Sequence, residues 1–260
     1  MKRLAVHLSM FFVLILFGAG CGPKPPVAGF PETTPLQEAL EKLRTRSESW
    51  QGYQARMTVR GESPKKNFSI QAVIVAALPD RLRFEAYKLG QSVGVLALSP
   101  VDSSLWIPSE QVVYRAPTGQ ELIDYFLGAA IPPEAFTRSL IAVLSSDQLQ
   151  GLQPLPMESD WVLVSGRPGE DTVYAWTFTP GFVSMEKVTV RQGDHFYSVV
   201  YDPPVSLDPA SLPGRITFLS GDWRLQVKID QLVPAEVTPD SAFQLSIPEG
   251  TRLVNLDGSL

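Results

Sequence analysis

This sequence is nearly free of the side chains that build disulfides and metal centres. Its 260 residues include one cysteine, Cys21, and two histidines, His7 and His195. A single cysteine excludes a disulfide framework within the chain. His7 lies in the first apolar run, so a metal cluster or a Ser-His-Asp site would have to be built around His195, in a turn-like segment. We therefore expect no enzymatic activity, no metal and no cofactor.

The chain also lacks an apolar run long enough to span a bilayer comfortably. The longest run covers residues 4–17 and is interrupted by His7 and Ser9. The basic pair at residues 2–3 precedes it, and the small residues 18–20 lead directly to Cys21. This pattern is similar to a bacterial lipoprotein signal, with residues 1–20 removed and Cys21 lipidated. The alternative is an ordinary cleaved signal followed by an incidental cysteine.

A proline-rich segment follows the cysteine. Residues 21–35 contain five prolines and few apolar residues, which is typical of an extended tether. We expect the folded domain to occupy residues 36–260, held to the membrane by the lipid on Cys21. Removal of residues 1–20 leaves 20 basic residues against 27 acidic ones, so the net charge moves from -5 to -7. This balance argues against nucleic acid or an anionic lipid surface as the main partner.

After the tether, the hydrophobic period changes from helical to strand-like. Leu36, Leu40 and Leu43 recur at helical spacing, which predicts an amphipathic helix over residues 36–48. From Gln51 onward, apolar and polar residues alternate through two strands separated by a Gly-Glu-Ser-Pro turn. Further strand-like runs occupy Arg81–Leu89, Ser92–Ser99, Ser104–Pro108, Gln111–Ala116, Trp161–Ser165, Val173–Thr179, Ser184–Arg191, Phe196–Asp202, Arg215–Leu219, Trp223–Leu232 and, as an edge strand, Phe243–Ile247.

Two helices are predicted within this series of strands. Thr118 is an expected N-cap with Glu121 three residues later, and Pro133 suits the first turn of the second helix. A long antiparallel sheet with helices inserted on one side is an α+β fold. It forms a half-open antiparallel β-barrel, in other words a curved sheet closed by a helical lid.

Four stretches of the sequence, together with the order of the elements, resemble the LolA/LolB superfamily of lipoprotein carriers and receptors. They are residues Asp80–Leu96, Gly119–Leu140, Leu212–Phe218 and Trp223–Asp230. The resemblance covers residues 36 to about 232. It implies that acyl chains of lipoproteins or similar lipids are held in an apolar cavity between the sheet and the helical lid.

The resemblance also implies a place for the protein in the cell envelope. Because it has Cys21, the chain resembles the receptor, a lipoprotein of the outer membrane that faces the periplasm and inserts cargo from a periplasmic lipoprotein carrier. Leu89 matches the receptor's protruding apolar loop residue, which helps insertion. The chain departs from the receptor at Lys88, where the receptor has proline. It also extends beyond the receptor's usual end from residue 233, with a carrier-like tail.

Ten apolar side chains are candidates to line the lipid site. They are Phe68, Ile70, Ile74, Leu82, Phe84, Val95, Phe126, Phe136, Leu140 and Ile141. The residue pattern alone favours a filled core made of the same side chains, whereas the resemblance favours a cavity. Leu89 has two readings as well, since it either contacts the membrane or packs beneath its turn. Arg81 and Arg83 are expected on a solvated face.

Two functions follow from these observations. The first is a lipid-handling receptor, favoured by Leu89 and the inserted helices. The second is a structural lipoprotein that docks onto an envelope assembly without lipid transfer, favoured by the acidic charge and the C-terminal segment.

Overall fold

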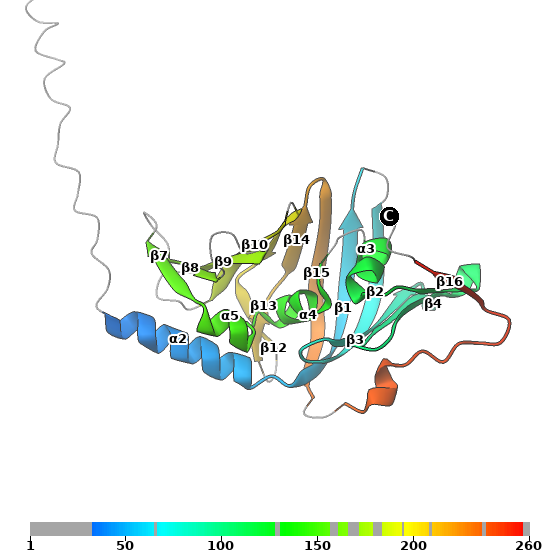
Figure 1. The fold of residues 1–260 in the computed structure, drawn as a ribbon, viewed down its shortest axis with the longest axis horizontal. Helices are drawn as coiled ribbons and strands as arrows, with labels where there is room; N and C mark the ends of the chain where they lie inside the picture. The colour runs from blue at the N-terminus through cyan, green and yellow to red at the C-terminus, as the bar shows by residue number, and fades with distance from the viewer. Residues whose placement is uncertain are drawn as a thin grey trace, which may run out of the picture.

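A single curved sheet of fourteen strands organises the protein (Figure 1). The computed structural model describes residues 33–64, 67–127, 131–156, 161–165, 172–178, 184–193, 195–207, 210–235 and 238–256. The strand order across the sheet is β16-β6-β5-β4-β3-β2-β1-β15-β14-β11-β10-β9-β8-β7. The strands are β1 (Gly52–Glu62), β2 (Asn67–Ala77), β3 (Arg81–Lys88), β4 (Gln91–Leu98), β5 (Ser103–Ile107), β6 (Val112–Arg115), β7 (Gln153–Pro156), β8 (Trp161–Ser165), β9 (Thr172–Phe178), β10 (Met185–Gln192), β11 (His195–Tyr201), β14 (Ile216–Ser220), β15 (Trp223–Pro234) and β16 (Arg252–Asn255).

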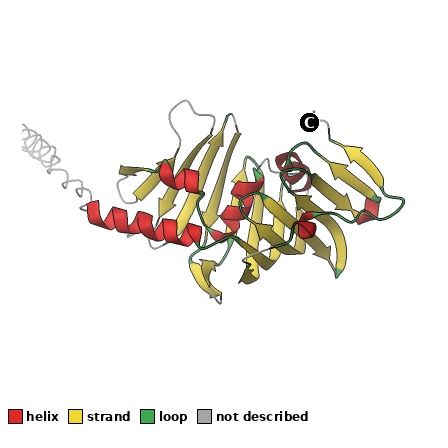
Figure 2. Ribbon diagram, turned by 60° about the horizontal axis from the view of Figure 1, so that its bottom comes forward, coloured by secondary structure: helices red, strands yellow, loops and turns green. Residues whose placement is uncertain are grey.

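The sheet bends like a barrel but does not close. Its centre is the antiparallel pair of β1 and β15, which runs from Tyr53 opposite Pro234 to Glu62 opposite Arg224. Its two edges are β16 and β7, which lie at opposite ends of the strand order. Only β16 beside β6 is a parallel pair among the described strands. Figure 2 shows the curvature and the helices on one side of the sheet. The predicted half-open antiparallel barrel is confirmed.

Alternation along the strands gives the sheet one apolar face. In β1, Tyr53, Ala55 and Met57 are buried, whereas Gln54 and Arg56 between them are exposed. Successive side chains of a strand point to opposite faces, so the buried set faces the helices. The period-two pattern therefore predicted both the strands and the face that they bury.

The helices are α2 (Thr33–Glu48), α3 (Gly119–Leu127), α4 (Pro133–Ile141) and α5 (Ser146–Gln150). Thr118 caps α3 as predicted: its hydroxyl accepts from the backbone N–H of Glu121, and its own N–H donates to the Glu121 carboxylate. Pro133 occupies the first turn of α4, where its missing N–H costs nothing. Helices α3, α4 and α5 follow β6 and precede β7, so this lid connects the two edge regions of the sheet across its inner face (Figure 1).

The core fills the space between the sheet and helices α3 and α4. Phe126 of α3 meets Phe84 of β3 edge to face, with ring centroids 6.0 Å apart. Phe136 of α4 packs against Phe218 of β14 at 5.4 Å. Helix α2 fixes the C-terminal end of α4, because the Arg46 guanidinium donates to the Ile141 carbonyl at 3.2 Å. The amphipathic helix predicted at residues 36–48 thus supports the lid.

Several short elements were not predicted. Helix α5 and strand β7 follow the lid directly, and the hairpin of β12 (Pro204–Leu207) and β13 (Ala210–Pro213) forms a separate two-stranded sheet. A capping box at Ser145 and Gln148 begins α5, where each side chain accepts from the other residue's backbone N–H. This local signal was readable in the sequence, but a five-residue helix is too short to show an apolar period.

The edge strand predicted at Phe243–Ile247 is wrong. The segment carries a short 3-10 helix, η3 (Asp240–Phe243), and the added strand is β16, further along the chain. The Arg83 guanidinium donates to the carbonyls of Ala242 and Gln244, so a side chain takes the groups that a strand ladder would use. Arg81 lies over the ring of Phe243. Both arginines hold the C-terminal segment against β3, which corrects the expectation of a merely solvated face.

Candidate functional site

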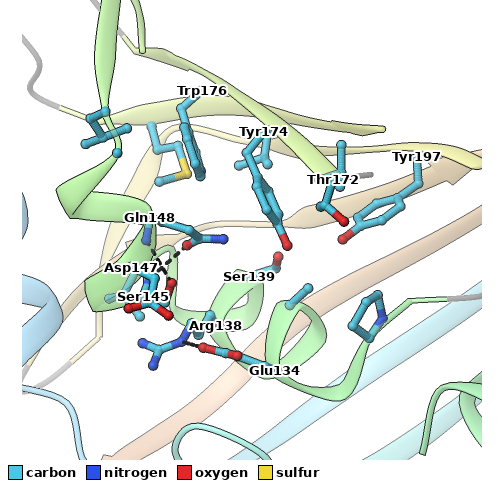
Figure 3. A pocket seen from close by; sticks show the side chains of 18 of the residues that line it. Glu134, Arg138, Ser139, Ser145, Asp147, Gln148, Thr172, Tyr174, Trp176 and Tyr197 are labelled. Carbon is cyan, nitrogen blue, oxygen red and sulfur yellow. Dashed lines mark hydrogen bonds and ion pairs between the residues drawn. The ribbon is translucent and has the colours of Figure 1, made fainter. Parts of the chain in front are cut away.

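A cavity of about 650 Å³ lies between the second half of the lid and strands β9, β10 and β11 (Figure 3). Helices α4 and α5 and the start of β7 form one wall. The inner face of the three strands forms the other. Its volume falls within the range of about 300–1,000 Å³ that is usual for small-molecule sites.

Aromatic side chains dominate the sheet wall of this cavity. Tyr174 and Trp176 of β9 stack with ring centroids 5.4 Å apart and planes 11° apart. Val190 pairs with Tyr174 on one side and with Tyr197 on the other, so these three residues form a row across the strands. One step along the strands, Val188 lies between Trp176 and Val199. This wall therefore offers aromatic and aliphatic surface, interrupted by tyrosine hydroxyls, along which a chain can lie.

The lid wall is polar and internally bonded. Arg138 pairs with Glu134 at 2.8 Å, and its guanidinium also donates to the Leu144 carbonyl at 3.1 Å. The Ser145–Gln148 capping box lies at the same wall (Figure 3). These bonds fix the turn between α4 and α5, so the lid is held in place from within.

The tyrosines of the sheet wall are neutral groups. Burial raises the pKa of Tyr197 and of Tyr201 far above the ordinary value. Burial also raises the pKa of Tyr174, and a hydrogen bond with Gln148 opposes this shift. Their hydroxyls therefore act as hydrogen-bonding groups without charge at any physiological pH.

The ten predicted lipid-site residues do not line this cavity. Ile74, Leu82, Phe84, Phe136, Leu140 and Ile141 are buried in the core between the sheet and the helices α3 and α4. Phe68, Ile70 and Phe126 are half-buried and pack against the same core. The register explains the grouping, because Ile74 lies opposite Phe84 across β2 and β3. The structure thus brings nine of the ten into the hydrophobic core, outside the set of residues that line the cavity.

Val95 stands apart from the other nine. It lies opposite Glu85 and Trp106, whereas its neighbour Leu96 lies opposite Phe84. Since adjacent residues of a strand point to opposite faces, Val95 faces away from the helices.

Leu89 is at the tip of the β3–β4 hairpin and is 98% exposed. Its φ of 50° places it in the left-handed region, next to Gly90 at 79°. Strands β2, β1, β15 and β14 lie between its hairpin and the strands of the cavity. The side chain does not pack beneath its turn.

Cys21, the signal and the tether lie outside the described residues. Within the part of the chain that is described, no helix has the length and apolar character to cross a membrane. His195 is exposed at the start of β11. Among the described residues, no three His, Cys, Asp or Glu side chains are grouped to hold a metal.

One further sequence pattern resembles a catalytic motif, but its structure differs from that motif. Gly90–Gly94 matches the letters of the G-x-S-x-G nucleophile elbow. That elbow needs a strand, a sharp turn and then a helix, but here the run forms a hairpin turn and the start of β4. Ser92 is therefore a strand residue, several strands away from His195.

No known family model and no curated protein matches this sequence. Solved structures do resemble its fold. A LolA superfamily protein from Nitrosomonas europaea matches with a TM-score of 0.53 at 13% identity, over 80% of this chain and 97% of that one. An outer membrane lipoprotein-sorting protein domain from Vibrio parahaemolyticus gives a TM-score of 0.53 at 12% identity, over 80% of this chain and 95% of that one. A DUF1329 family protein from Desulfovibrio piger gives 0.58 at 9%, over 82% and 98%.

These likenesses define the architecture. The protein is an unclosed, mostly antiparallel sheet with a helical lid. Its fold is similar to that of the LolA superfamily protein, as the resemblance in sequence predicted.

Sequence reasoning did not find the cavity. The side chains of its sheet wall come from β9, β10 and β11, which were predicted as strands, and alternation identifies their buried face. The sequence did not show the packing. Side chains fill the space between the lid and β1–β4, whereas a cavity separates the lid from β9–β11. That difference depends on the path of α4 and α5, which no local pattern specifies.

Proposed function

We propose that this protein is a lipid-anchored lipoprotein of the cell envelope that binds acyl chains of lipoproteins or lipids and helps insert them in the outer membrane. The signal at residues 1–20 directs export, lipidation of Cys21 supplies the anchor, and residues 21–35 form the tether. Its partners are the acylated cargo and a periplasmic lipoprotein carrier. It is not an enzyme.

The observation that carries this proposal is the cavity beside α4 and α5. At about 30 Å³ for a group of the size of a water or a methylene, its volume of about 650 Å³ holds on the order of twenty such groups. One acyl chain of about 16 carbons fits within that limit. The wall formed by Trp176 and Val188 is apolar, as such a chain requires.

Leu89 supports the step of delivery to the membrane. Turn chemistry favours glycine or asparagine at a positive φ, and a side chain that is 98% exposed gains nothing from packing. Local structure thus gives no reason for leucine at this position. Contact with a bilayer interface does, since it buries the side chain in an apolar medium.

The test is binding of a fluorescent acyl probe by the soluble domain. Val188→Trp places a large ring in the middle of the cavity and is expected to lower affinity at least tenfold. The matched control is Thr189→Trp, one residue along the same strand, where the side chain points to the other face. Equal affinity of both variants and the wild type would place the probe elsewhere.

A structural lipoprotein without lipid transfer is the second candidate. The filled core at the predicted site residues and the C-terminal segment bound across β3 favour it. Absence of acyl binding in the wild type would select this function.

A further inference from the structure

The buried hydroxyl of Tyr197, on the cavity wall, has no hydrogen-bond partner among the described residues. Tyr197 belongs to β11 and is 3% exposed. The side chain points into the cavity from the sheet, with its oxygen toward the lid (Figure 3). Such a group is rare, because burial removes its bonds to water and the fold normally replaces them. A hydroxyl kept in this state is ready to bind a polar atom of a ligand.

Its neighbour Tyr201 shows the contrast. Tyr201 also lines the cavity, and it is 6% exposed. Its hydroxyl, however, interacts with Ser139 of the lid, which lowers its pKa against the effect of burial. The two tyrosines come from the same face of the same strand, and of the two only Tyr197 has a buried hydroxyl without a partner among the described residues.

The charges at the cavity argue for a neutral ligand head. Among the described residues that line it, the ionisable carboxylates are those of Glu134 and Asp147, and the one cation is Arg138. Arg138 is already engaged by Glu134 and by the Leu144 carbonyl. Within this described lining, a carboxylate or phosphate would therefore enter beside two acids without a free cation to neutralise it.

The strand register gives the ligand a direction. Tyr197 lies in one row with Val190 and Tyr174, and only Thr172 of the described lining lies in the row beyond it. The next row along the strands contains Trp176 and Val188, which offer apolar surface without an unpaired polar group. If the polar head of a ligand binds at Tyr197, its acyl chain would therefore lie against Trp176 and Val188.

We infer that the cavity takes acyl chains joined to a neutral ester or amide head, whose carbonyl oxygen accepts a hydrogen bond from the Tyr197 hydroxyl. The inference rests on the proposed function and specifies the head that it left open. Acylglycerols and the lipid-modified N-terminus of a lipoprotein share this chemistry. Tyr197 is then a specificity residue of the acyl site.

The test compares competitors of equal chain length against a fluorescent acyl probe. They are monolauroylglycerol, an N-lauroylated peptide, laurate and dodecane. Wild-type protein is expected to bind the ester and the amide at least tenfold more tightly than laurate. The better of the first two identifies the source of the head, a glycerolipid or a lipoprotein.

Tyr197→Phe removes only the donor. We expect it to weaken binding of the ester and the amide about tenfold, equivalent to about 1.4 kcal/mol, and to leave dodecane unchanged. Without ligand, its midpoint of thermal unfolding is expected to equal or exceed that of the wild type, because the hydroxyl has no partner to lose. Tyr114→Phe is the matched control, because Tyr114 is a buried tyrosine of β6 outside the cavity, and the selectivity of this variant between ester and alkane should stay that of the wild type.

The outcomes separate the two claims. If no acyl compound displaces the probe, the proposed function fails. If the compounds bind but Tyr197→Phe changes nothing, or laurate binds as well as the ester, the inference alone is overturned.

Discussion

The Tyr53 hydroxyl, on β1, donates a hydrogen bond to the Thr137 carbonyl, in α4, at 2.9 Å, and neither residue is exposed. The two are 84 positions apart in sequence. The bond joins the central strand of the sheet to the helix that lies between the filled core and the cavity. It therefore fixes the height of the lid above the sheet.

Tyr53→Phe removes this hydrogen bond and keeps the aromatic ring that fills the core. The Thr137 carbonyl remains within α4, so the expected loss in the free energy of unfolding is about 1 kcal/mol. Urea denaturation followed by circular dichroism measures it. Tyr174→Phe, on the cavity wall, serves as a comparison. A loss below the error of the measurement would mean that the lid is held by apolar packing alone.

Stability should fall at alkaline pH. Burial raises the pKa of Tyr53, Tyr197 and Tyr201 far above the value of about 10 in an unfolded chain. The folded protein keeps these protons while the unfolded chain releases them. The stabilisation is thus complete below pH 10 and declines above it, by about 1.4 kcal/mol per pH unit for each tyrosine.

The measurement is the free energy of unfolding between pH 8 and pH 11.5. In Tyr53→Phe, the decline of the free energy of unfolding with pH above pH 10 should be smaller by about 1.4 kcal/mol per pH unit, the contribution of one tyrosine. An unchanged slope in that variant would show that Tyr53 ionises equally in both states.

Prediction from sequence succeeded where a local pattern determines the structure. The alternation at Tyr53, Ala55 and Met57 defined β1 and its buried face, and the Thr118 cap defined the start of α3. Register and packing were not accessible in the same way. Phe84 and Trp176 are both buried aromatic residues of strands, and nothing in the local sequence shows that the first lies in a filled core and the second beside a cavity.

The strand prediction for the C-terminal segment was wrong for a different reason. Phe243–Ile247 alternates like a strand, but Arg83 binds its carbonyls from β3, a contact across about 160 residues. Alternation reports that one face is buried, and a segment anchored by Phe243 satisfies that condition without joining the sheet.

Phe84 tests where the acyl chain lies. Phe84→Ala should lower the free energy of unfolding by about 3–5 kcal/mol, because the side chain is 1% exposed and packed against Phe126. The milder Phe84→Leu keeps most of the volume and is suited to binding measurements. We expect its affinity for an acyl probe to equal that of the wild type. A tenfold loss would return the lipid site to the residues predicted from sequence.

Cys21→Ser should release a folded protein from the membrane. Helix α2 begins at Thr33, twelve residues after Cys21, so we expect the lipid to contribute to location and not to packing. Fractionation of cells that produce the variant measures this, with the thermal unfolding midpoint as a control for folding. Recovery of the variant in the membrane pellet to the wild-type extent would contradict the lipid anchor.

Leu89→Glu separates a transfer protein from a docking protein. A buried chain of about 16 carbons is worth on the order of 13 kcal/mol at about 0.8 kcal/mol per methylene, so cavity and bilayer must hold it almost equally for release to occur. Contact of Leu89 with the interface adds about 1–2 kcal/mol at the moment of transfer, and a glutamate would be repelled there. We expect a several-fold slower delivery of a bound fluorescent lipopeptide to liposomes.

Neither fold stability nor acyl affinity should change in Leu89→Glu, because the Leu89 side chain is 98% exposed and lies four strands away from the cavity. Val101→Glu is the matched control, since Val101 is 95% exposed in the β4–β5 turn at the other end of β4. If delivery slows equally in both variants, added negative charge is the cause and not the loss of an apolar contact at Leu89. If it slows only in Leu89→Glu, the β3–β4 hairpin is the part of the protein that meets the membrane.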